Sequence, residues 1–303
     1  MSPLFIHLLM LLCATLVSTS FTVGAAIAGD LDPAVLTLVR FVVAGIILAP
    51  IVKLRTGLQF SWSFLGRCTI ISGCLVIFFW CMFLALRYTT ALNTSVIFTL
   101  VPPMSGIYAM IMVRERLPGA QLAALAVGMI GAIWVIFRGD FDLLLAMHWN
   151  KGDLIFLAGS VCMGFYTPLV KMLHRGESML AMTLWVLVSG SCWLLLLSGG
   201  KLLTVDWGSV AGKTWVGILY LSVFTTVITF FITQFCVPYI GPTRAMAYSY
   251  LYPGLVLIID LLLGHGLPPL AVLPGVAIVL LAMVVLQFSS KSNRGKENAE
   301  PSI

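Results

Sequence analysis

The chain has 303 residues, of which 60% are apolar and 9% are charged, with a formal net charge of +6. Its mean hydropathy is +1.08, whereas soluble domains carry about 25% charged residues. Because so few charges cannot cover a surface in water, this composition excludes a disordered chain, a fibrous protein and an ordinary cytosolic enzyme.

Breaks in hydrophobicity divide the chain into ten apolar segments of roughly the 20 residues that a transmembrane helix needs. They are continuous runs, about twice as long as the alternating strands of a membrane barrel, so we predict helices throughout. The first segment has no basic residue before it and no small-residue cleavage site, which favours an uncleaved span. The predicted spans are 4–24, 33–52, 65–86, 91–113, 118–137, 153–173, 178–198, 213–235, 243–263 and 268–288.

The distribution of Lys and Arg predicts the orientation of these spans. With a cytoplasmic amino terminus, the inner segments hold eleven basic residues and the outer loops hold five. Cytoplasmic loops of membrane proteins carry the excess of positive charge, so we expect both termini to be cytoplasmic. The positive net charge then reflects topology and contact with membrane lipid rather than binding of nucleic acid. The polar tail, 289–303, is predicted to be disordered.

The two halves of the chain show signs of a duplication. A displacement of 150 residues places Pro103 on Pro253 and Pro118 on Pro268. Each half contains five spans, and this odd number means that the second half enters the membrane from the opposite side. Inverted repeats of this kind are typical of secondary transporters, whose substrate site lies near the midplane between the repeats.

Several motifs resemble the EamA-type repeat of the drug/metabolite transporter superfamily. They are Thr37-Leu38-Val39-Arg40-Phe41, Ala85-Leu86-Arg87-Tyr88-Thr89-Thr90-Ala91, Pro102-Pro103 and Glu115-Arg116-Leu117. The resemblance implies an all-α integral membrane protein with ten transmembrane helices in a 5+5 inverted repeat around a central cavity. It implies repeats at 1–140 and 150–288, and export of a small metabolite across a bacterial inner membrane. The second half departs from the pattern, because His265 stands where the family usually has a glutamate.

Two ionisable residues lie within predicted spans, where a charge is costly and therefore indicates function. Arg40 lies seven residues into the second span, and Asp260 lies near the outer end of the ninth. They either pair, or jointly face the cavity and an ionic group of the substrate. The alternative is a purely structural role, as an ion pair or with Arg40 bonded to carbonyls at a helix end. At the cytoplasmic side, Glu115 and Arg244 are candidate gate residues, with a role in topology alone as the alternative.

Prolines and polar side chains mark the same spans. Pro102, Pro103 and Pro253 lie near the middle of spans four and nine, where proline removes a backbone donor and kinks a helix. Thr225, Thr229 and Thr233 are four residues apart and share one helix face. This polar stripe either lines the path or bonds neighbouring helices. The predicted substrate-binding residues are Arg40, Trp80, Asn93, Ser95, Tyr166, Thr229, Gln234, Tyr248 and Asp260.

A small-residue face at Ala120, Ala124, Gly128 and Ala132 allows close helix approach. Packing within the chain is one interpretation, and a homodimer contact is the other.

The sequence predicts no cofactor, no metal site and no catalytic residues, because it lacks a phosphate-binding loop and its four histidines are scattered. We therefore expect a secondary transporter for a metabolite, amino acid or amphipathic compound, with proton coupling through Asp260 and Glu115, exchange or facilitated diffusion left open. A receptor or assembly scaffold is the alternative function.

Overall fold

The computed structural model describes residues 3–114, 119–136, 139, 140, 142, 150–240, 242–264 and 270–289, and these residues form helices and turns without a strand. The first half contains α1 (Pro3–Ile27), α2 (Pro33–Arg55), α3 (Trp62–Ala85), α4 (Ala91–Phe98), α5 (Val101–Met112) and α6 (Gly119–Ile136). The second half contains α8 (Lys151–Leu173), α9 (Met179–Ser198), α10 (Lys201–Thr204), α11 (Gly212–Ser222), η1 (Val223–Ile228), α12 (Thr229–Ile240), α13 (Pro242–Ala247), η2 (Tyr248–Leu251), α14 (Tyr252–Leu262), η3 (Leu270–Val272) and α15 (Leu273–Ser289).

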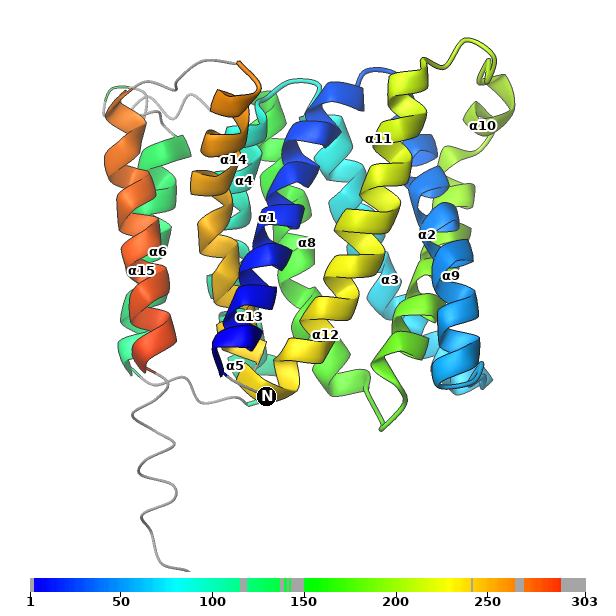
Figure 1. Ribbon diagram of the computed structural model, residues 1–303, viewed down its shortest axis with the longest axis horizontal. Helices are drawn as coiled ribbons and strands as arrows, with labels where there is room; N and C mark the ends of the chain where they lie inside the picture. The colour runs from blue at the N-terminus through cyan, green and yellow to red at the C-terminus, as the bar shows by residue number, and fades with distance from the viewer. Residues whose placement is uncertain are drawn as a thin grey trace, which may run out of the picture.

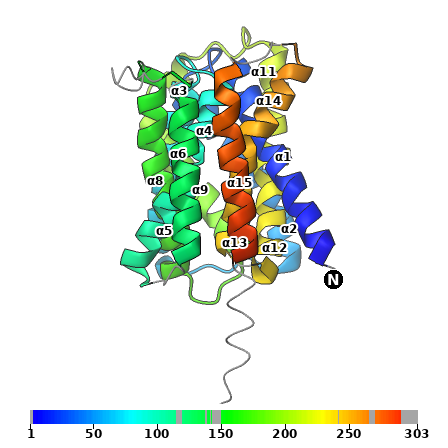
Figure 2. The same cartoon turned by 90° about the vertical axis from the view of Figure 1, so that its left-hand side faces the viewer.

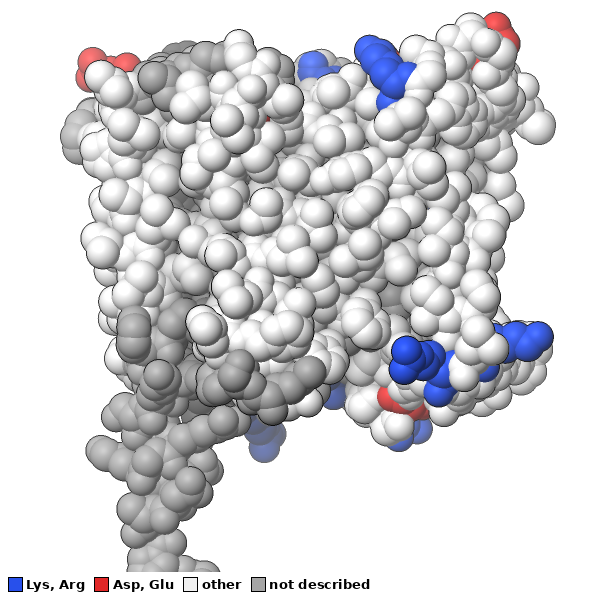
Figure 3. Space-filling model, viewed as in Figure 1, with Lys and Arg blue, Asp and Glu red and all other residues white. Residues whose placement is uncertain are grey.

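Eight helical stretches are long and apolar enough to cross a membrane, and two shorter apolar helices occupy Gly119–Val135 and Leu270–Val285. The predicted all-helical fold is therefore confirmed. The face of the molecule in Figure 3 has a broad uncharged belt between two charged ends, as a bilayer requires. The predicted tail from 290 onward lies outside the described residues.

Polar caps define where several helices begin. The Asp32 carboxylate accepts a hydrogen bond from Ala34 N at the start of α2, and Ser61 caps α3 in the same way. Thr90 caps α4, and Asn150 caps α8. Each cap satisfies a backbone N–H that the first helical turn leaves without a partner. The capping residues therefore fix the first residue of each of these helices, which the hydrophobic pattern alone gives only approximately.

Helix pairs from the two halves make up the bundle. Helices α6 and α15 pack together at one edge, and α2 and α9 pack together at the other, as Figures 1 and 2 show. Between these edges, α3 packs on α8, while α1 packs on α12 and α14. We call the end of the bundle where Pro3 begins α1 the N-terminal end, and the end carrying the turn 28–32 the distal end.

Close approach of α6 and α15 depends on two glycines. A Cβ atom built on Gly131 would lie 2.9 Å from the Gly275 carbonyl oxygen, and one built on Gly275 would lie 2.6 Å from Val135. On the predicted small-residue face, Gly128 lies against the Tyr250 ring, which a Cβ would meet at 2.9 Å. At Gly128 this face is used for packing within the chain.

Candidate functional site

A cavity of about 560 Å³ lies between the two halves of the bundle. Its wall includes Met10, Phe21, Arg40, Phe78, Phe79 and Phe98 from the first half and Tyr166, His174, Thr225, Thr229, Tyr248 and Tyr252 from the second. Most of these side chains are apolar or aromatic, with a few hydroxyls between them. A cavity of this size and lining is typical of sites for small organic molecules.

Aromatic side chains from both halves close the cavity toward the distal end. The Phe98 ring lies 5.4 Å from the Phe78 ring and 5.5 Å from the Tyr252 ring, measured between centroids. Phe21 joins the same group at 6.0 Å from Phe98. We call Phe21, Phe78, Phe98 and Tyr252 the aromatic cluster. Because these rings come from α1, α3, α4 and α14, they hold together helices from both halves.

Beyond the aromatic cluster the bundle is densely packed up to the distal end. Ile27, Ala28 and Leu31 at the end of α1 are at most 5% exposed, and they belong to the same apolar core as the aromatic cluster. Lining residues such as Met10, Lys171 and His174 instead lie in the half of the bundle near Pro3. The cavity therefore extends from the aromatic cluster toward the N-terminal end.

Polar contacts between the two halves add to this packing at the distal end. Lys201 Nζ lies 2.9 Å from Asp32 Oδ2, and Lys213 Nζ lies 3.6 Å from Asp30 Oδ2. The Thr214 hydroxyl also donates to Asp30 Oδ2 at 2.5 Å. We call the two ion pairs the distal ion pairs. They tie the turn after α1 to α10 and to the first turn of α11.

Arg40 is the only charged side chain in the described cavity wall with 1% or less of its surface exposed. Its Nε and Nη2 donate to the Thr226 hydroxyl at 3.2 and 3.0 Å, and Nη2 also donates to Thr225 at 3.1 Å. The guanidinium lies over the Phe79 ring, 4.3 Å from its centroid. Among the described residues, Nη1 has no acceptor within hydrogen-bond distance. The buried charge is thus held by neutral groups.

A π-helical turn, η1, presents the two threonines to Arg40. Thr225 and Thr226 both donate their hydroxyl protons to the Leu221 carbonyl, at 2.8 and 3.0 Å. Their oxygens are then available as acceptors for the guanidinium. Single π-helical turns inside longer helices are often found at functional sites.

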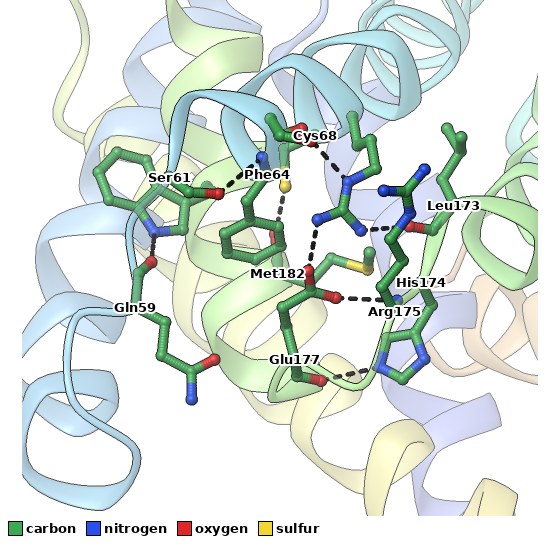
Figure 4. Close-up of polar contacts among 12 residues, drawn as sticks. Gln59, Ser61, Phe64, Cys68, Leu173, His174, Arg175, Glu177 and Met182 are labelled. Atoms are coloured by element: carbon green, nitrogen blue, oxygen red, sulfur yellow. Dashed lines mark hydrogen bonds and ion pairs between the residues drawn. The ribbon is translucent and has the colours of Figure 1, made fainter.

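A second polar group ties the halves together at the N-terminal end (Figure 4). Arg67 of α3 forms an ion pair with Glu177, and its Nη1 donates to the Leu173 carbonyl at 2.6 Å. Glu177 Oε2 also accepts from Arg175 N at 2.9 Å. The hydrogen bond from Arg67 lowers the pKa of Glu177 from 4.5 to about 2. His174, which lines the cavity, contacts the Glu177 carbonyl through its ring nitrogen at 2.8 Å.

Comparison with known proteins assigns the chain to a family. The sequence profile of the EamA-like transporter family matches residues 4–137 and again residues 150–288. This chain belongs to the EamA-like transporter family. The resemblance of its motifs to the EamA repeat is therefore confirmed, and the chain is a multi-pass membrane transporter built from two copies of that repeat.

Relatives and a solved structure agree with this assignment. The chain is 25% identical over 218 residues to the uncharacterized transporter YyaM of Bacillus subtilis, covering 72% of this chain and 70% of YyaM. It is 21% identical over 152 residues to the uncharacterized transporter YetK of the same bacterium, covering 50% and 46%. A solved structure named only "Crystal structure of protein" shares the fold, with a TM-score of 0.71, 18% identity and coverage of 94% and 96%.

In this EamA-like transporter, four of the predicted substrate-binding residues line the cavity: Arg40, Tyr166, Thr229 and Tyr248. The predicted threonine stripe faces the cavity as well, since Thr225, Thr229 and Thr233 all lie in its wall. Thr233 also contacts the Cys13 sulfur at 3.4 Å, so the stripe both lines the cavity and bonds a neighbouring helix.

Four other predicted residues lie away from the cavity wall. The Asn93 amide donates to Asp153 Oδ1 at 3.4 Å, in a polar group near the start of α8. Ser95 donates to the Leu92 carbonyl of its own helix, and Trp80 is half-buried outside the wall. Asp260 accepts a hydrogen bond from Thr22 of α1 at 3.1 Å.

The expected pairing of Arg40 with Asp260 is not among the described contacts. Arg40 faces η1 and Phe79, while Asp260 faces α1 near the distal end. The physical reason is helix packing: α2 packs on α3, α9, α11 and η1, whereas α14 packs on α1, α4 and α15.

The predicted prolines coincide with interruptions of two apolar stretches. Helix α4 ends at Phe98, and α5 restarts at Val101 with Pro102 and Pro103 in its first turn. In the second half, η2 separates α13 from α14, and Pro253 lies in the first turn of α14. Pro102 lines the cavity. Pro103 and Pro253 are buried and outside the wall, each next in the sequence to a lining residue, Pro102 and Tyr252.

Four residues named in the sequence analysis fall where the structure gives no side-chain description. Glu115 and His265 lie outside the described residues, and only the backbone of Gln234 and Arg244 is described, within α12 and α13. Their roles remain predictions.

The sequence reasoning missed several residues that the transporter brings together. Phe78, Phe79 and Phe98 are single aromatics in apolar runs, and nothing in their spacing separates a cavity wall from lipid-facing surface. The Arg67–Glu177 pair joins residues 110 positions apart. Asp153, which is 4% exposed, could have been found, because a buried acid near the start of a span is unusual.

Proposed function

We propose that this EamA-like transporter is a secondary transporter that exports a small metabolite, amino acid or amphipathic compound across a bacterial inner membrane by alternating access. Ten transmembrane helices form its two five-helix repeats, 1–140 and 150–288, with inverted topology. The membrane lipid surrounds the uncharged belt, and the small molecule occupies the central cavity. Export as the direction rests on family resemblance.

Two observations support the inverted arrangement. Asn150 at the start of α8 donates to the Tyr88 carbonyl after α3, whereas the Leu173 carbonyl at the end of α8 accepts from Arg67 near the start of α3. Helix α8 thus runs opposite to α3. Since α1 and α3 begin at the same end of the bundle, the first helices of the two repeats run in opposite directions.

One observation carries the proposal of alternating access. The cavity extends to the N-terminal end, while the aromatic cluster, the packed core and the distal ion pairs close the other end. A cavity closed at one end is what one of the two alternating states requires. The ion pairs that close the distal end are exposed and therefore weak enough to break during a transport cycle.

The charge distribution supports a cytoplasmic N-terminal end. Lys53, Arg55, Arg67, Lys171 and Arg175 lie at or near this end, and cytoplasmic segments carry the excess of basic residues. With this orientation, both termini are cytoplasmic and the cavity described above faces the cytoplasm.

Comparison of metabolites tests the proposed function. Spent medium and cell extract are compared between cells that lack the protein and cells that overproduce it. We expect one solute to accumulate outside the overproducing cells and inside the deleted cells. A cavity variant, Thr229→Leu, serves as a control because it fills the site without removing the protein, and it should behave as the deletion.

The alternative function, a receptor or scaffold without transport, predicts a different result. No solute would then differ between the strains although the protein is present in the membrane, and a fixed protein partner would copurify with it.

A further inference from the structure

We propose that the cavity selects amphipathic organic anions, with a carboxylate that accepts a hydrogen bond from Arg40 and an apolar or aromatic body that fills the remaining volume. This inference rests on the proposed function and specifies its substrate class. It is argued from the charge, the hydrogen bonds and the lining of the cavity.

The positive charge of Arg40 lacks a counter-charge among its described contacts. Its three hydrogen bonds go to the hydroxyls of Thr225 and Thr226, and its flat face lies on Phe79. Arginine stays protonated in proteins, and a charge removed from water without an opposite charge is costly. A carboxylate in the cavity would supply the missing charge, and Nη1 is a buried donor with no described acceptor.

The rest of the wall strengthens this preference for anions. Among the described lining residues there is no Asp or Glu, whereas Lys171 and His174 lie toward the N-terminal end. A zwitterion such as an amino acid would need a partner for its ammonium group, and a cation would be repelled by Arg40. In a cavity with low-dielectric walls, such a positive field is felt across the site.

The lining also defines the body of the substrate. Phe78, Phe98, Tyr252 and Met163 offer apolar surface and aromatic faces. A sugar or nucleotide would leave many hydroxyls without partners against these walls, and each buried polar group without a hydrogen bond is costly. The volume of about 560 Å³ accommodates a molecule with one or two rings.

Access to Arg40 involves Phe79. Only 1% of Arg40 is exposed, and the Phe79 ring both lines the cavity and covers one face of the guanidinium. For a carboxylate to reach the guanidinium, this ring would have to rotate aside. The anion then replaces an aromatic face with an opposite charge.

Three probes of nearly equal shape test the inference. Purified protein is titrated with 3-phenylpropanoate, 3-phenylpropanamide and 3-phenylpropylamine, and binding is measured by calorimetry. We expect the carboxylate to bind at least about tenfold more tightly than the amide, as a charge-assisted hydrogen bond provides, and the amine to bind most weakly.

Variants assign the preference to Arg40. Arg40→Gln should lose the carboxylate preference, while Arg55→Gln removes one charge from the exposed end of the same helix and should keep it. Thr225→Asp places a carboxylate beside Arg40 Nη2. Because this carboxylate supplies the missing counter-charge, we expect the variant to fold even if Arg40→Gln does not. Its carboxylate preference should be at least about tenfold lower than that of the neutral, equally sized Thr225→Asn.

The outcomes separate this inference from the proposed function. Equal binding of the three probes, tighter binding of the amide or amine, or no binding of the carboxylate at millimolar concentration would overturn the inference. Equal preference in Thr225→Asp and Thr225→Asn would overturn the role of Arg40. Export of a neutral or cationic solute in the metabolite comparison would keep the transporter and reject its anion selectivity.

Discussion

The guanidinium of Arg40 lies flat over the ring of Phe79, with 4.3 Å between Cζ and the ring centroid. Both residues line the cavity, and they come from neighbouring helices, α2 and α3, of the first repeat. The contact places a permanent positive charge beside an aromatic face within the apolar belt of the bundle. A structural ion pair would have brought a carboxylate to Arg40 instead, and the described contacts of Arg40 are two threonines and this ring.

The hydroxyls of Thr226 and Thr229 should contribute unequally to stability. Thr226 accepts two hydrogen bonds from Arg40, whereas the Thr229 hydroxyl bonds only backbone carbonyls of its own helix. We expect Thr226→Val to destabilise the protein by about 1–3 kcal/mol, because Arg40 Nε loses its acceptor and Nη2 keeps only Thr225. Thr229→Val should cost less than about 1 kcal/mol. Thermal unfolding in detergent measures both, and equal losses would contradict the assigned role of Thr226.

Weakening the distal ion pairs should open the distal end. Each exposed ion pair contributes about 0–1 kcal/mol, so Lys201→Gln together with Lys213→Gln should raise the population of the distally open state by up to roughly thirtyfold. The measurement is the maleimide labelling rate of Leu31→Cys, a position that is 5% exposed, in protein without its native cysteines. Glu177→Gln removes an ion pair at the other end and is the matched control. Unchanged labelling in the double variant would count against a gate at this end.

The Arg67–Glu177 pair makes stability depend on acid pH. The hydrogen bond from Arg67 holds the pKa of Glu177 at about 2, below its ordinary value of 4.5. A carboxyl with a lowered pKa stabilises the fold above its ordinary pKa, and this contribution is lost as the pH falls through the folded-state value. Between these two values, the melting temperature of the wild type should therefore fall more steeply than that of Glu177→Gln. Parallel curves would show that the pair contributes no stability.

Substituting alanine for two helical glycines, Gly131 and Gly45, should have opposite effects on stability. In Gly131→Ala the new methyl group would lie 2.9 Å from the Gly275 carbonyl oxygen, whereas a Cβ on Gly45 meets nothing within 4 Å. Forcing α6 and α15 apart costs about 1–3 kcal/mol, so Gly131→Ala should lower the melting temperature and the yield of monodisperse protein. Gly45→Ala should leave both unchanged or higher. Similar losses in both variants would mean that close packing of α6 on α15 is not required.

The sequence predicted the helical elements well because lipid imposes a simple rule. Each apolar run of sufficient length between turn or charged residues became helix. The caps Asp32 and Thr90, which fix two of the helix starts, were not predicted. The interruptions also follow from sequence, since Pro102 and Pro253 each lie in the first turn of a restarted helix.

The site was predicted only in part. Arg40 and the threonine stripe could be found because a charge or a row of hydroxyls in an apolar span must turn away from lipid. Asn93 and Asp260 also turn away from lipid, but they contact Asp153 and Thr22 near the distal end rather than the cavity. Polarity alone therefore did not predict which neighbour each side chain faces. Phe79 could not be found, because its role depends on the neighbouring helix that brings Arg40 beneath it.

The most direct test of the central claim is the flux of radiolabelled 3-phenylpropanoate into liposomes that contain the purified protein. We expect saturable uptake above that of protein-free liposomes, competition by the unlabelled carboxylate but not by its amide, and loss of uptake in Thr225→Asp relative to Thr225→Asn. Uptake that equals the protein-free background in the wild type, or that is the same in both Thr225 variants, would contradict transport of an organic anion past Arg40.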